Sequence, residues 1–521
     1  MNDILEGLRD PSAYPHETGG IEVVETHISL LFLTGRYAYK VKKNVDLGFL
    51  DFSSPEKREH YCREELRLNR RLCPELYLDV VPVTNDDGRL RIAGSGRIVD
   101  HAVKMVQFDR SMELDSLLSR NLLREEAVDQ IAEVVAAFHL SLPAVGPDTP
   151  FGRPEMVIQP VLDNFTEAAR LTMDREEAEA LASLKSWSEA EHRRLLTLFS
   201  SRKATGRIRQ CHGDMHTGNM VLWNGKVTIF DCIEFNPFLS TIDVISDIAF
   251  LVMDLEHRGR PEYAWRFLND YLSLTGDYDG LSLLRFYKTY RAMVRAKVTA
   301  IRLLQETADE RKSGILDEHR AYLALARSFG MAKPCGLVIT CGVSGSGKTT
   351  LARRMAEKLQ AVHIRSDVER KRLFGIERLE KTGGERKRAL YAAETTKRTY
   401  AKMHSIASRC LDENHTVIAD ATFLCEEERR KFVELAERRG LPVMILCCSA
   451  PENILEHRVN SRRREGADAS EADRSVLVSQ LKNRDTLSGK EQDIAIFVDT
   501  SVPESEEQAM EAVAQRIRTG T

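Results

Sequence analysis

Short runs of alternating apolar and polar residues cover the first hundred positions, a pattern typical of strands that bury one face. Three strands are predicted between residues 21 and 43 by "IEVVETH", "SLLFL" and "RYAYKVKK", with Thr34-Gly35 as the turn between the last two. Two more strands are predicted by "LYLDVVPVT" and "GRIVDHAVKMVQF". The region therefore predicts a small sheet.

One amphipathic helix interrupts these strands, in "SSPEKREHYCREELRLNRRLCP". Ser53 is expected to cap its N-terminus, Pro55 suits its first turn, and Glu56 completes a capping box. Glu65 shares a helix face with apolar residues, so we expect it to point inward, whereas Glu64 aligns with charged residues.

The pattern then becomes helical. Apolar residues three and four positions apart, as in "AVDQIAEVVAAFHLSL", predict helices through about Arg202 and again from Asp243 to about Phe329. Between these two stretches, "NMVLW" and "KVTIFD" predict a strand pair joined by a tight turn at Asn224-Gly225. Glycine and proline in "GMAKPCG" predict a domain boundary at residues 330–336.

Beyond that boundary, apolar strands alternate with helices. The strands are "GLVITCG", "VHIRSD", "HTVIADAT" and "PVMILCC", and "KTTLARRMAEKL" is the first helix. Such alternation favours a parallel sheet covered on both faces. The expected organisation is an α+β domain over residues 1–330, followed by an α/β domain over residues 336–521.

Composition narrows the classes of protein. The 521 residues are 42% hydrophobic and 30% charged, with a net charge of −4, which disfavours a nucleic-acid partner and a membrane surface. No apolar run reaches the roughly 20 residues that span a bilayer. The start, "MNDILEGLRD", lacks the pattern of a signal peptide, and the ten cysteines form no CxxC pair. We therefore expect a cytoplasmic protein; the sequence does not indicate an oligomeric state.

The stretch "GVSGSGKTT" matches GxxxxGK[ST] in full and lies between an apolar strand and a helix. Its glycines let backbone N–H groups close around phosphate oxygens, and the helix N-terminus adds partial positive charge. Lys348 is expected to reach the β- and γ-phosphates, and the Thr349 hydroxyl to bind Mg²⁺. The expected nucleotide-binding residues are Gly342, Ser344, Gly345, Ser346, Gly347, Lys348, Thr349 and Thr350.

Further candidates follow this motif. Asp367 lies just past the second strand, where a carboxylate can accept a proton from an acceptor hydroxyl. Asp420 ends another strand and is expected to hold Mg²⁺ through water. The run "HRVNSRRREGADASEAD" contains Arg458 and Arg462, which either close over the phosphates as a lid or form a solvated basic face.

These residues resemble the P-loop kinases of small molecules and of polynucleotide 5′ ends, a group that includes gluconate kinase, chloramphenicol phosphotransferase and zeta-toxin-like proteins. The resemblance covers roughly residues 335–518. It implies kinase activity, with Asp367 as the base that activates the acceptor and Arg462 among the catalytic lid residues. Nothing in the sequence selects the acceptor.

A second polar stretch, "CHGDMHTGN", allows three interpretations. Cys211, His212 and His216 are the candidate ligands of a metal cluster. The stretch is alternatively a structural loop between a helix and a strand. In the third interpretation it is a kinase catalytic loop, because Asp214 precedes Asn219 by five positions. His212 is then a structural hydrogen-bonding residue rather than a base.

Distant residues favour the catalytic interpretation. Asp231 ends an apolar strand, where kinases hold their metal-binding aspartate, and Lys40 ends "YAYK" as a kinase phosphate-pairing lysine does. Glu65 is the expected partner of Lys40. Together, Asn219 and Asp231 are expected to hold Mg²⁺, while Asp214 orients and deprotonates an acceptor hydroxyl.

This set resembles the aminoglycoside phosphotransferase family, whose loop reads HGDxxxxN, over about residues 21–327. The resemblance implies a kinase-like domain with an N-lobe at about residues 20–108 and a C-lobe at about residues 109–330. It also implies that "KMVQF", which contains Met105, is the interlobe hinge that meets adenine, and that Asp247 buttresses the catalytic loop.

Two features depart from that family pattern. The strand pair before Lys40 has only "ETHIS" at its turn, without a glycine-rich loop, and Lys42 lies on the same strand face, where it can share or take the role of Lys40. The joined chain resembles bacterial proteins described as fusions of an aminoglycoside phosphotransferase-like domain with a P-loop kinase-like ATPase.

The leading hypothesis is a bifunctional kinase that uses ATP, with GTP as the alternative, and Mg²⁺ to phosphorylate hydroxyl groups of small metabolites. In a second hypothesis, one domain only binds nucleotide and regulates the other. In a third, the P-loop domain phosphorylates RNA or DNA 5′-hydroxyls, and the acidic balance of the chain disfavours this one.

Overall fold

The strands predicted in the first hundred residues form one antiparallel sheet in the computed structural model, which describes residues 2–46, 48, 50–170, 174–306, 308–465 and 469–520. The spatial order is β1-β2-β3-β6-β4-β5. These strands are β1 (Glu22–Glu25), β2 (Ser29–Leu33), β3 (Tyr37–Lys42), β4 (Tyr77–Asp86), β5 (Arg89–Ile92) and β6 (Arg97–Val106). The five predicted strands are confirmed. Strand β5 was not predicted; it follows a turn at Asp87-Gly88, whose φ angles of 53° and 89° suit a hairpin.

Helix α2 (Pro55–Asn69) packs against strands β4 and β6 of this sheet. Its N-cap is Ser54, whose side chain accepts a hydrogen bond from the Lys57 N–H, so the expected cap Ser53 is wrong. The Ser53 hydroxyl instead donates to Asp51 Oδ1 at 2.5 Å, and Glu56 becomes the second helical residue rather than the third. With Ser54 as the cap, the third helical residue is Lys57, so the expected capping box with Glu56 is wrong.

Helices dominate the chain from residue 114 to residue 330, as predicted, and the hairpin of β8 (Met220–Trp223) and β9 (Lys226–Ile229) is confirmed. A second pair, β7 (Ile208–Gln210) with β10 (Thr241–Asp243), was not predicted because three residues are too few to show a period. The helices are α3 (Leu114–Ser119), α4 (Glu125–Ser141), α5 (Pro154–Arg170), α6 (Arg175–Ala204), α7 (Pro237–Ser240), α8 (Val244–His257), α9 (Pro261–Thr275), α10 (Leu281–Gln305) and α11 (Asp309–Gly330). Among the described residues, no helix has both the length and the apolar character to cross a membrane.

The predicted parallel sheet is confirmed in the C-terminal part, with the order β12-β13-β11-β14-β15. Its strands are β11 (Leu337–Cys341), β12 (Val362–Arg365), β13 (Val417–Asp420), β14 (Val443–Ser449) and β15 (Ala495–Asp499). Strand β15 was not predicted, although residues 494–498 form a short apolar run; it lies at the edge of the sheet, and its Phe497 is 70% exposed.

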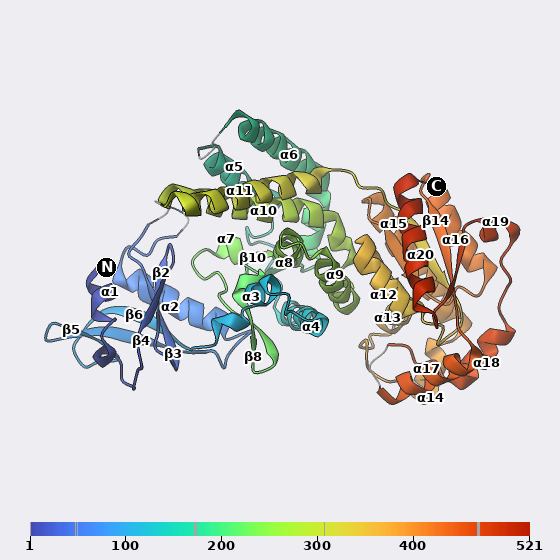
Figure 1. Cartoon of the computed structure of the whole chain (residues 1–521), viewed down its shortest axis with the longest axis horizontal. Coiled ribbons are helices and arrows are strands. Elements are labelled where there is room, and N and C mark those ends of the chain that lie inside the picture. The colour runs from blue at the N-terminus through green and yellow to red at the C-terminus, as the bar shows by residue number, and fades with distance from the viewer. Residues whose placement is uncertain are drawn as a thin grey trace. The chain divides into compact units, whose positions relative to one another are not determined.

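Helices cover both faces of this parallel sheet (Figure 1). Helices α12 (Lys348–Leu359) and α20 (Pro503–Thr519) enclose a core that includes Val338, Met355 and Met444. Helices α15 (Ala393–Asp412) and α16 (Glu426–Glu437) contact the strands from the other face. The shorter helices are α13 (Ser366–Arg372), α14 (Gly384–Leu390), α17 (Glu452–Glu465), α18 (Arg474–Lys482) and α19 (Gly489–Asp493).

Packing divides the chain into two compact units. The first comprises Met1–Asp254 with Phe286–Ala324, and the second comprises Leu255–Arg285 with Leu325–Thr521. Helix α9 therefore packs as part of the second unit, although it precedes the expected boundary at residues 330–336. Within this unit α9 lies along α12, where Arg353 and Asp270 form an ion pair of 2.7 Å.

The side chain of Asn269 in α9 binds the outer edge of the parallel sheet. Its Nδ2 donates to the Ala361 carbonyl at 2.9 Å, and its Oδ1 accepts the His363 N–H at 2.9 Å. Because β12 is an edge strand, these backbone groups would otherwise have no strand partner on that side. A single amide thus takes the place of a neighbouring strand.

Candidate phosphotransfer sites

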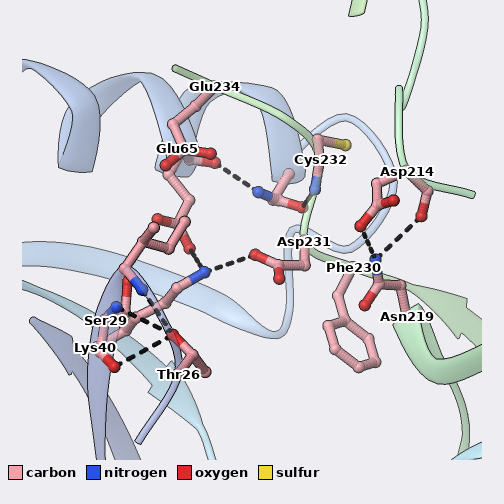
Figure 2. A network of polar contacts seen from close by, with 12 residues as sticks. Thr26, Ser29, Lys40, Glu65, Asp214, Asn219, Phe230, Asp231, Cys232 and Glu234 are labelled. Atoms are coloured by element: carbon pink, nitrogen blue, oxygen red, sulfur yellow. Dashed lines mark hydrogen bonds and ion pairs between the residues drawn. The ribbon is translucent and has the colours of Figure 1, made fainter. Parts of the chain in front are cut away.

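Lys40 lies where side chains from three separate elements meet (Figure 2). Its Nζ on β3 is 2.9 Å from Glu65 Oε1 of α2 and 2.5 Å from Asp231 Oδ1, which follows β9. Glu65 is fully buried, so the expectation that it points inward is confirmed. Burial acts to lower the pKa of Lys40, but Asp231 and Glu65 raise it well above the ordinary lysine value. The ammonium group therefore stays charged.

Lys42 occupies a different position from the one expected. Its ammonium group is fully buried and forms ion pairs with Glu65 Oε2, at 2.7 Å, and with Glu234. Burial opposes the ionised form of Glu65, but Lys40 and Lys42 lower the pKa of this carboxyl to about 2. In this arrangement Lys42 fixes Glu65 from behind, and only Lys40 remains partly exposed for a phosphate.

The loop residues Asp214 and Asn219 are brought together as their spacing predicts. Asn219 Nδ2 donates to the Asp214 carbonyl at 3.0 Å and to Asp214 Oδ2 at 3.1 Å (Figure 2). His216 Nε2 is 3.4 Å from Asp214 Oδ2. Burial acts to raise the pKa of Asp214, but His216 and Arg295 hold it well below its usual range. Asp214 is therefore a carboxylate at neutral pH.

Buried side chains hold the backbone of this loop. Both carboxylate oxygens of Asp247 accept loop N–H groups, from His212 at 3.0 Å and from Gly213 at 2.8 Å, which is the buttress expected for Asp247. Arg291 Nη1 donates to the Gly213 carbonyl at 2.9 Å. Asp254 accepts from the Thr217 N–H at 2.9 Å and from its hydroxyl. These contacts hold the loop backbone in place from the buried side.

The metal-cluster interpretation of the loop does not fit its contacts. His212 donates from Nε2 to the Phe230 carbonyl at 2.8 Å and accepts the Asp214 N–H at Nδ1, so both ring nitrogens are engaged. Burial lowers the pKa of His212, which keeps the ring neutral. The Cys211 thiol donates to the Ile242 carbonyl, and His216 accepts the Gly218 N–H. These groups stabilise the loop instead of converging on a cation.

Asn219 and Asp231 lie at the same end of the β8–β9 hairpin, since the Phe230 N–H donates to the Asn219 carbonyl at 3.0 Å. Asp231 has a left-handed backbone with φ 67°, a conformation that aspartate adopts more readily than most residues other than glycine, and it turns the chain after β9. Asn219 directs its amide nitrogen at Asp214, so its oxygen faces away from Asp214 (Figure 2). Carboxylate and amide oxygens are the ligands that Mg²⁺ prefers, so this pair fits the ion.

The expected adenine hinge, Lys104–Phe108, begins on the last three residues of β6. Met105 is 9% exposed and lies in the core between the sheet and α2. Just beyond it, the Gln107 N–H donates to the Arg36 carbonyl at 3.1 Å, and the Gln107 side chain accepts the Gly35 N–H at 2.8 Å. These contacts tie the hinge to the turn between β2 and β3.

The glycine-rich loop of the second unit begins directly after β11 and ends at α12. Gly345 and Gly347 have left-handed φ angles of 83° and 75°. The Lys348 ammonium donates to the Val343 carbonyl at 2.7 Å and lies 3.4 Å from Ser346 Oγ. A lysine folded back over its own loop is placed to exchange a carbonyl for phosphate oxygens. Thr349 and Thr350 follow in the first turn of α12.

Two helices, α17 and α18, contact this loop through polar side chains. Gln480 of α18 accepts the Ser344 N–H at 2.8 Å through its side chain. Arg458 of α17 donates to the Thr500 hydroxyl at 2.8 Å and to the Gly345 carbonyl at 3.3 Å, so it holds the loop rather than a solvated face. Arg462 belongs to α17, but its side chain lies outside the described part of the chain.

Asp420 ends β13 beside the glycine-rich loop and is 4% exposed. Its carboxylate oxygens contact His363 Nε2 at 3.2 Å and the Thr340 hydroxyl at 3.3 Å. Burial opposes ionisation, but the His363 hydrogen bond lowers the pKa of Asp420 to about 2. Asp367 lies in the first turn of α13 and is partly exposed. Burial, and after it the negative charge of Asp367, raises the pKa of Tyr391.

Three polar residues that contact the candidate sites were not predicted from the sequence. Glu234 neutralises Lys42, His363 positions Asp420, and Gln480 occupies a loop N–H. Glu234 follows Asp231 by three positions, so a second acidic residue in "FDCIEF" is the one usable signal. The other two lie on a strand and a distant helix, and no local pattern marks them.

Comparison with protein-family models gives a separate match for each of the two parts of the chain. Residues 51–284 match the model of the phosphotransferase enzyme family, and residues 337–487 match an AAA domain. The first part of the chain is therefore similar to the phosphotransferase enzyme family and has a kinase-like fold, and it is followed by a P-loop domain with a parallel sheet. It is an enzyme of the kinase class, and the predicted resemblance is confirmed.

Two relatives align over most of the chain, and solved kinase structures align with one part of it each. Uncharacterized proteins of Mycobacterium tuberculosis and Mycobacterium bovis are each 29% identical over 466 residues, which cover 89% of this chain and 91% of the relative. A choline/ethanolamine kinase family protein from Mesorhizobium loti is 14% identical, with a TM-score of 0.37, and covers 63% of this chain and 100% of that chain. A gluconokinase from Sinorhizobium meliloti is 22% identical, with a TM-score of 0.26, and covers 36% of this chain and 96% of that chain.

Proposed function

We propose that the protein is a bifunctional phosphotransferase in which each domain transfers the γ-phosphate of ATP to a hydroxyl group of a small metabolite. One observation supports the proposal: each domain has its own candidate phosphate-binding lysine close to its own acidic residues, Lys40 beside Glu65 and Asp231, and Lys348 near enough to Asp420 to lower the pKa of that carboxyl. Neither set borrows a described residue from the other domain.

In the kinase-like domain, Lys40 is held by Glu65 and pairs with phosphate oxygens. Asp214 accepts a hydrogen bond from the acceptor hydroxyl and takes its proton as the oxygen bonds to the γ-phosphorus. The bond between that phosphorus and the bridging oxygen breaks, and ADP leaves with the electron pair. Ionised Asp214 suits this role because its pKa lies well below neutrality.

In the P-loop domain, backbone N–H groups from Gly342 to Thr350 surround the phosphates, and Lys348 turns from the Val343 carbonyl to them. Asp367 serves as the base for the acceptor, and lid arginines, with Arg462 among them, stabilise the transferred group. Arg458 supports the loop through Gly345.

Both sites are proposed to use ATP, with GTP as the alternative, and Mg²⁺. Asn219 and Asp231 would hold the ion in one domain, and Thr349 and Asp420 in the other; all four offer oxygen ligands. When bound, the ion neutralises phosphate charge and favours attack by the hydroxyl.

The test is phosphate transfer from labelled ATP to a metabolite extract, followed by identification of each labelled product. Asp214→Asn is expected to remove one set of products and Lys348→Met the other. Asp148→Asn and Lys358→Met are matched controls, because both residues are exposed, Asp148 is far in sequence from the catalytic loop, and Lys358 lies at the opposite end of α12 from the glycine-rich loop. If neither active-site variant changes any product, the proposal fails.

Two other outcomes would redirect the proposal. Loss of nucleotide binding without loss of any product, for one variant only, would make that domain a regulator. Labelling of RNA or DNA 5′ ends that weakens steeply with added salt would make the P-loop domain a polynucleotide kinase.

A further inference from the structure

Two cysteines lie side by side at the start of the glycine-rich loop. Cys341 is the last residue of β11, and the strand register pairs it directly with Cys447 of β14. Register partners on neighbouring parallel strands direct their side chains to the same face of the sheet. Both thiols are free and partly exposed, and the Cys341 Sγ also lies 3.5 Å from the Phe423 carbonyl oxygen.

The surroundings make the two thiols unequal. The hydrogen bond with Cys447, followed by the positive charges of Arg429 and Lys348, lowers the pKa of Cys341 to about 7 against the effect of burial. The same hydrogen bond and burial raise the pKa of Cys447. One sulfur is therefore readily ionised while its neighbour stays protonated, as in pairs made of an attacking and a resolving cysteine.

We propose that Cys341 and Cys447 form an oxidation site that takes a hydroperoxide and closes to a disulfide, which weakens nucleotide binding by the adjacent glycine-rich loop. The effect on nucleotide rests on the proposed function of the P-loop domain. The cross-link itself does not.

The chemistry balances with a hydroperoxide as the oxidant. The Cys341 thiolate attacks the terminal peroxide oxygen, which breaks the O–O bond, gives a sulfenic acid and releases water or an alcohol after protonation. The Cys447 sulfur then attacks the Cys341 sulfur and displaces hydroxide, which leaves as water with the Cys447 proton. Two thiols lose two hydrogens, and the peroxide is reduced.

The disulfide would affect the loop because it changes the separation of the ends of β11 and β14. A disulfide most often holds its two Cα atoms about 5.5–6 Å apart, whereas neighbouring strands lie about 4.8 Å apart, so the bond favours a wider separation of the strand ends. Gly342 follows Cys341 directly with φ 147°, and a Cβ there would lie only 2.4 Å from the Cys448 carbonyl oxygen, so the start of the loop lies close to β14. A change in the separation of β11 and β14 therefore displaces the first residue of the loop.

The test uses the full chain, first reduced and then treated with hydrogen peroxide. Peptide mass spectrometry without reduction is expected to find Cys341 linked to Cys447. Binding of a fluorescent ATP analogue that Lys348→Met abolishes is expected to weaken about tenfold, the order expected when a charged hydrogen bond of the loop is lost, and dithiothreitol should restore it. Absence of the link, or a link with unchanged binding, overturns the proposal.

Variants separate this site from other cysteines. Cys447→Ser is expected to retain binding under peroxide, while Cys425→Ser, which changes an exposed cysteine elsewhere, should respond like the unaltered chain. If the reduced protein shows no binding that depends on Lys348, the proposed function of the P-loop domain fails, and the cross-link is still scored by mass. A response that persists in Cys447→Ser contradicts the proposal.

Discussion

The two candidate phosphate-binding lysines are held in opposite ways. Lys40 is held by carboxylates from a helix and from a strand end, 25 and 191 positions away in sequence. Lys348 is held by the Val343 carbonyl, five positions away in the same loop. The first site is assembled by packing, and the second is built by local backbone conformation. Substitutions far from Lys40 in the sequence should therefore disturb the first site, whereas the second site should respond mainly to substitutions in its own loop.

The largest expected effect tests the assembled site. In Lys42→Met, Glu65 and Glu234 remain buried without their shared cation. Breaking a buried pair in this way costs about 3–5 kcal/mol. Urea unfolding should show this loss in the kinase-like domain. Lys43→Met is the matched control, since Lys43 pairs with exposed Glu25, and such pairs contribute at most about 1 kcal/mol. Equal effects would show that Lys42 does not hold the site.

A smaller effect tests the local site. Gly347→Ala places a Cβ 2.8 Å from Thr500 Oγ1 at a residue with φ 75°. Such strain costs about 1–3 kcal/mol and should fall on nucleotide binding by the P-loop, measured by titration with a fluorescent ATP analogue. Gly440→Ala is the control, because Gly440 has φ 64° with nothing within 4 Å. Unaltered binding in Gly347→Ala would contradict local construction of this site.

The smallest effect concerns pH. Burial lowers the pKa of His212, so the folded chain keeps this ring neutral while the unfolded chain protonates it below about 6.5. The stabilisation is present above that pH and declines as pH falls, by up to about 1.4 kcal/mol per unit. Unfolding of His212→Gln between pH 7 and pH 5 should lack this component of the slope. An unchanged slope would show that His212 is protonated in the folded chain.

The difference between a site assembled by packing and a site built in one loop also explains which site residues can be predicted from the sequence. The glycine-rich loop and its lysine are contiguous, so the motif alone locates them. Lys40, Glu65, Asp214, Asn219 and Asp231 are also predicted, but only from a family pattern that sets their order, and packing then brings Glu65 and Asp231 to Lys40.

Errors arise where neighbouring residues compete or where partners are distant. Ser53 and Ser54 are equally good caps by type, and the choice depends on Asp51, which binds Ser53. Lys42 lies on the same strand face as Lys40, and only its buried ion pair with Glu234 distinguishes the two lysines. Strand register, not sequence pattern, reveals that Cys341 and Cys447 are neighbours.

The amide of Asn269 has a consequence for dividing the chain. A fragment that begins at the expected boundary, residues 336–521, lacks α9, and the edge of β12 then exposes the Ala361 carbonyl and the His363 N–H. Open strand edges are templates for pairing with another chain. Such a fragment is expected to self-associate at concentrations where the full chain does not, as light scattering would show. Asn269 thereby protects the P-loop sheet from aggregation.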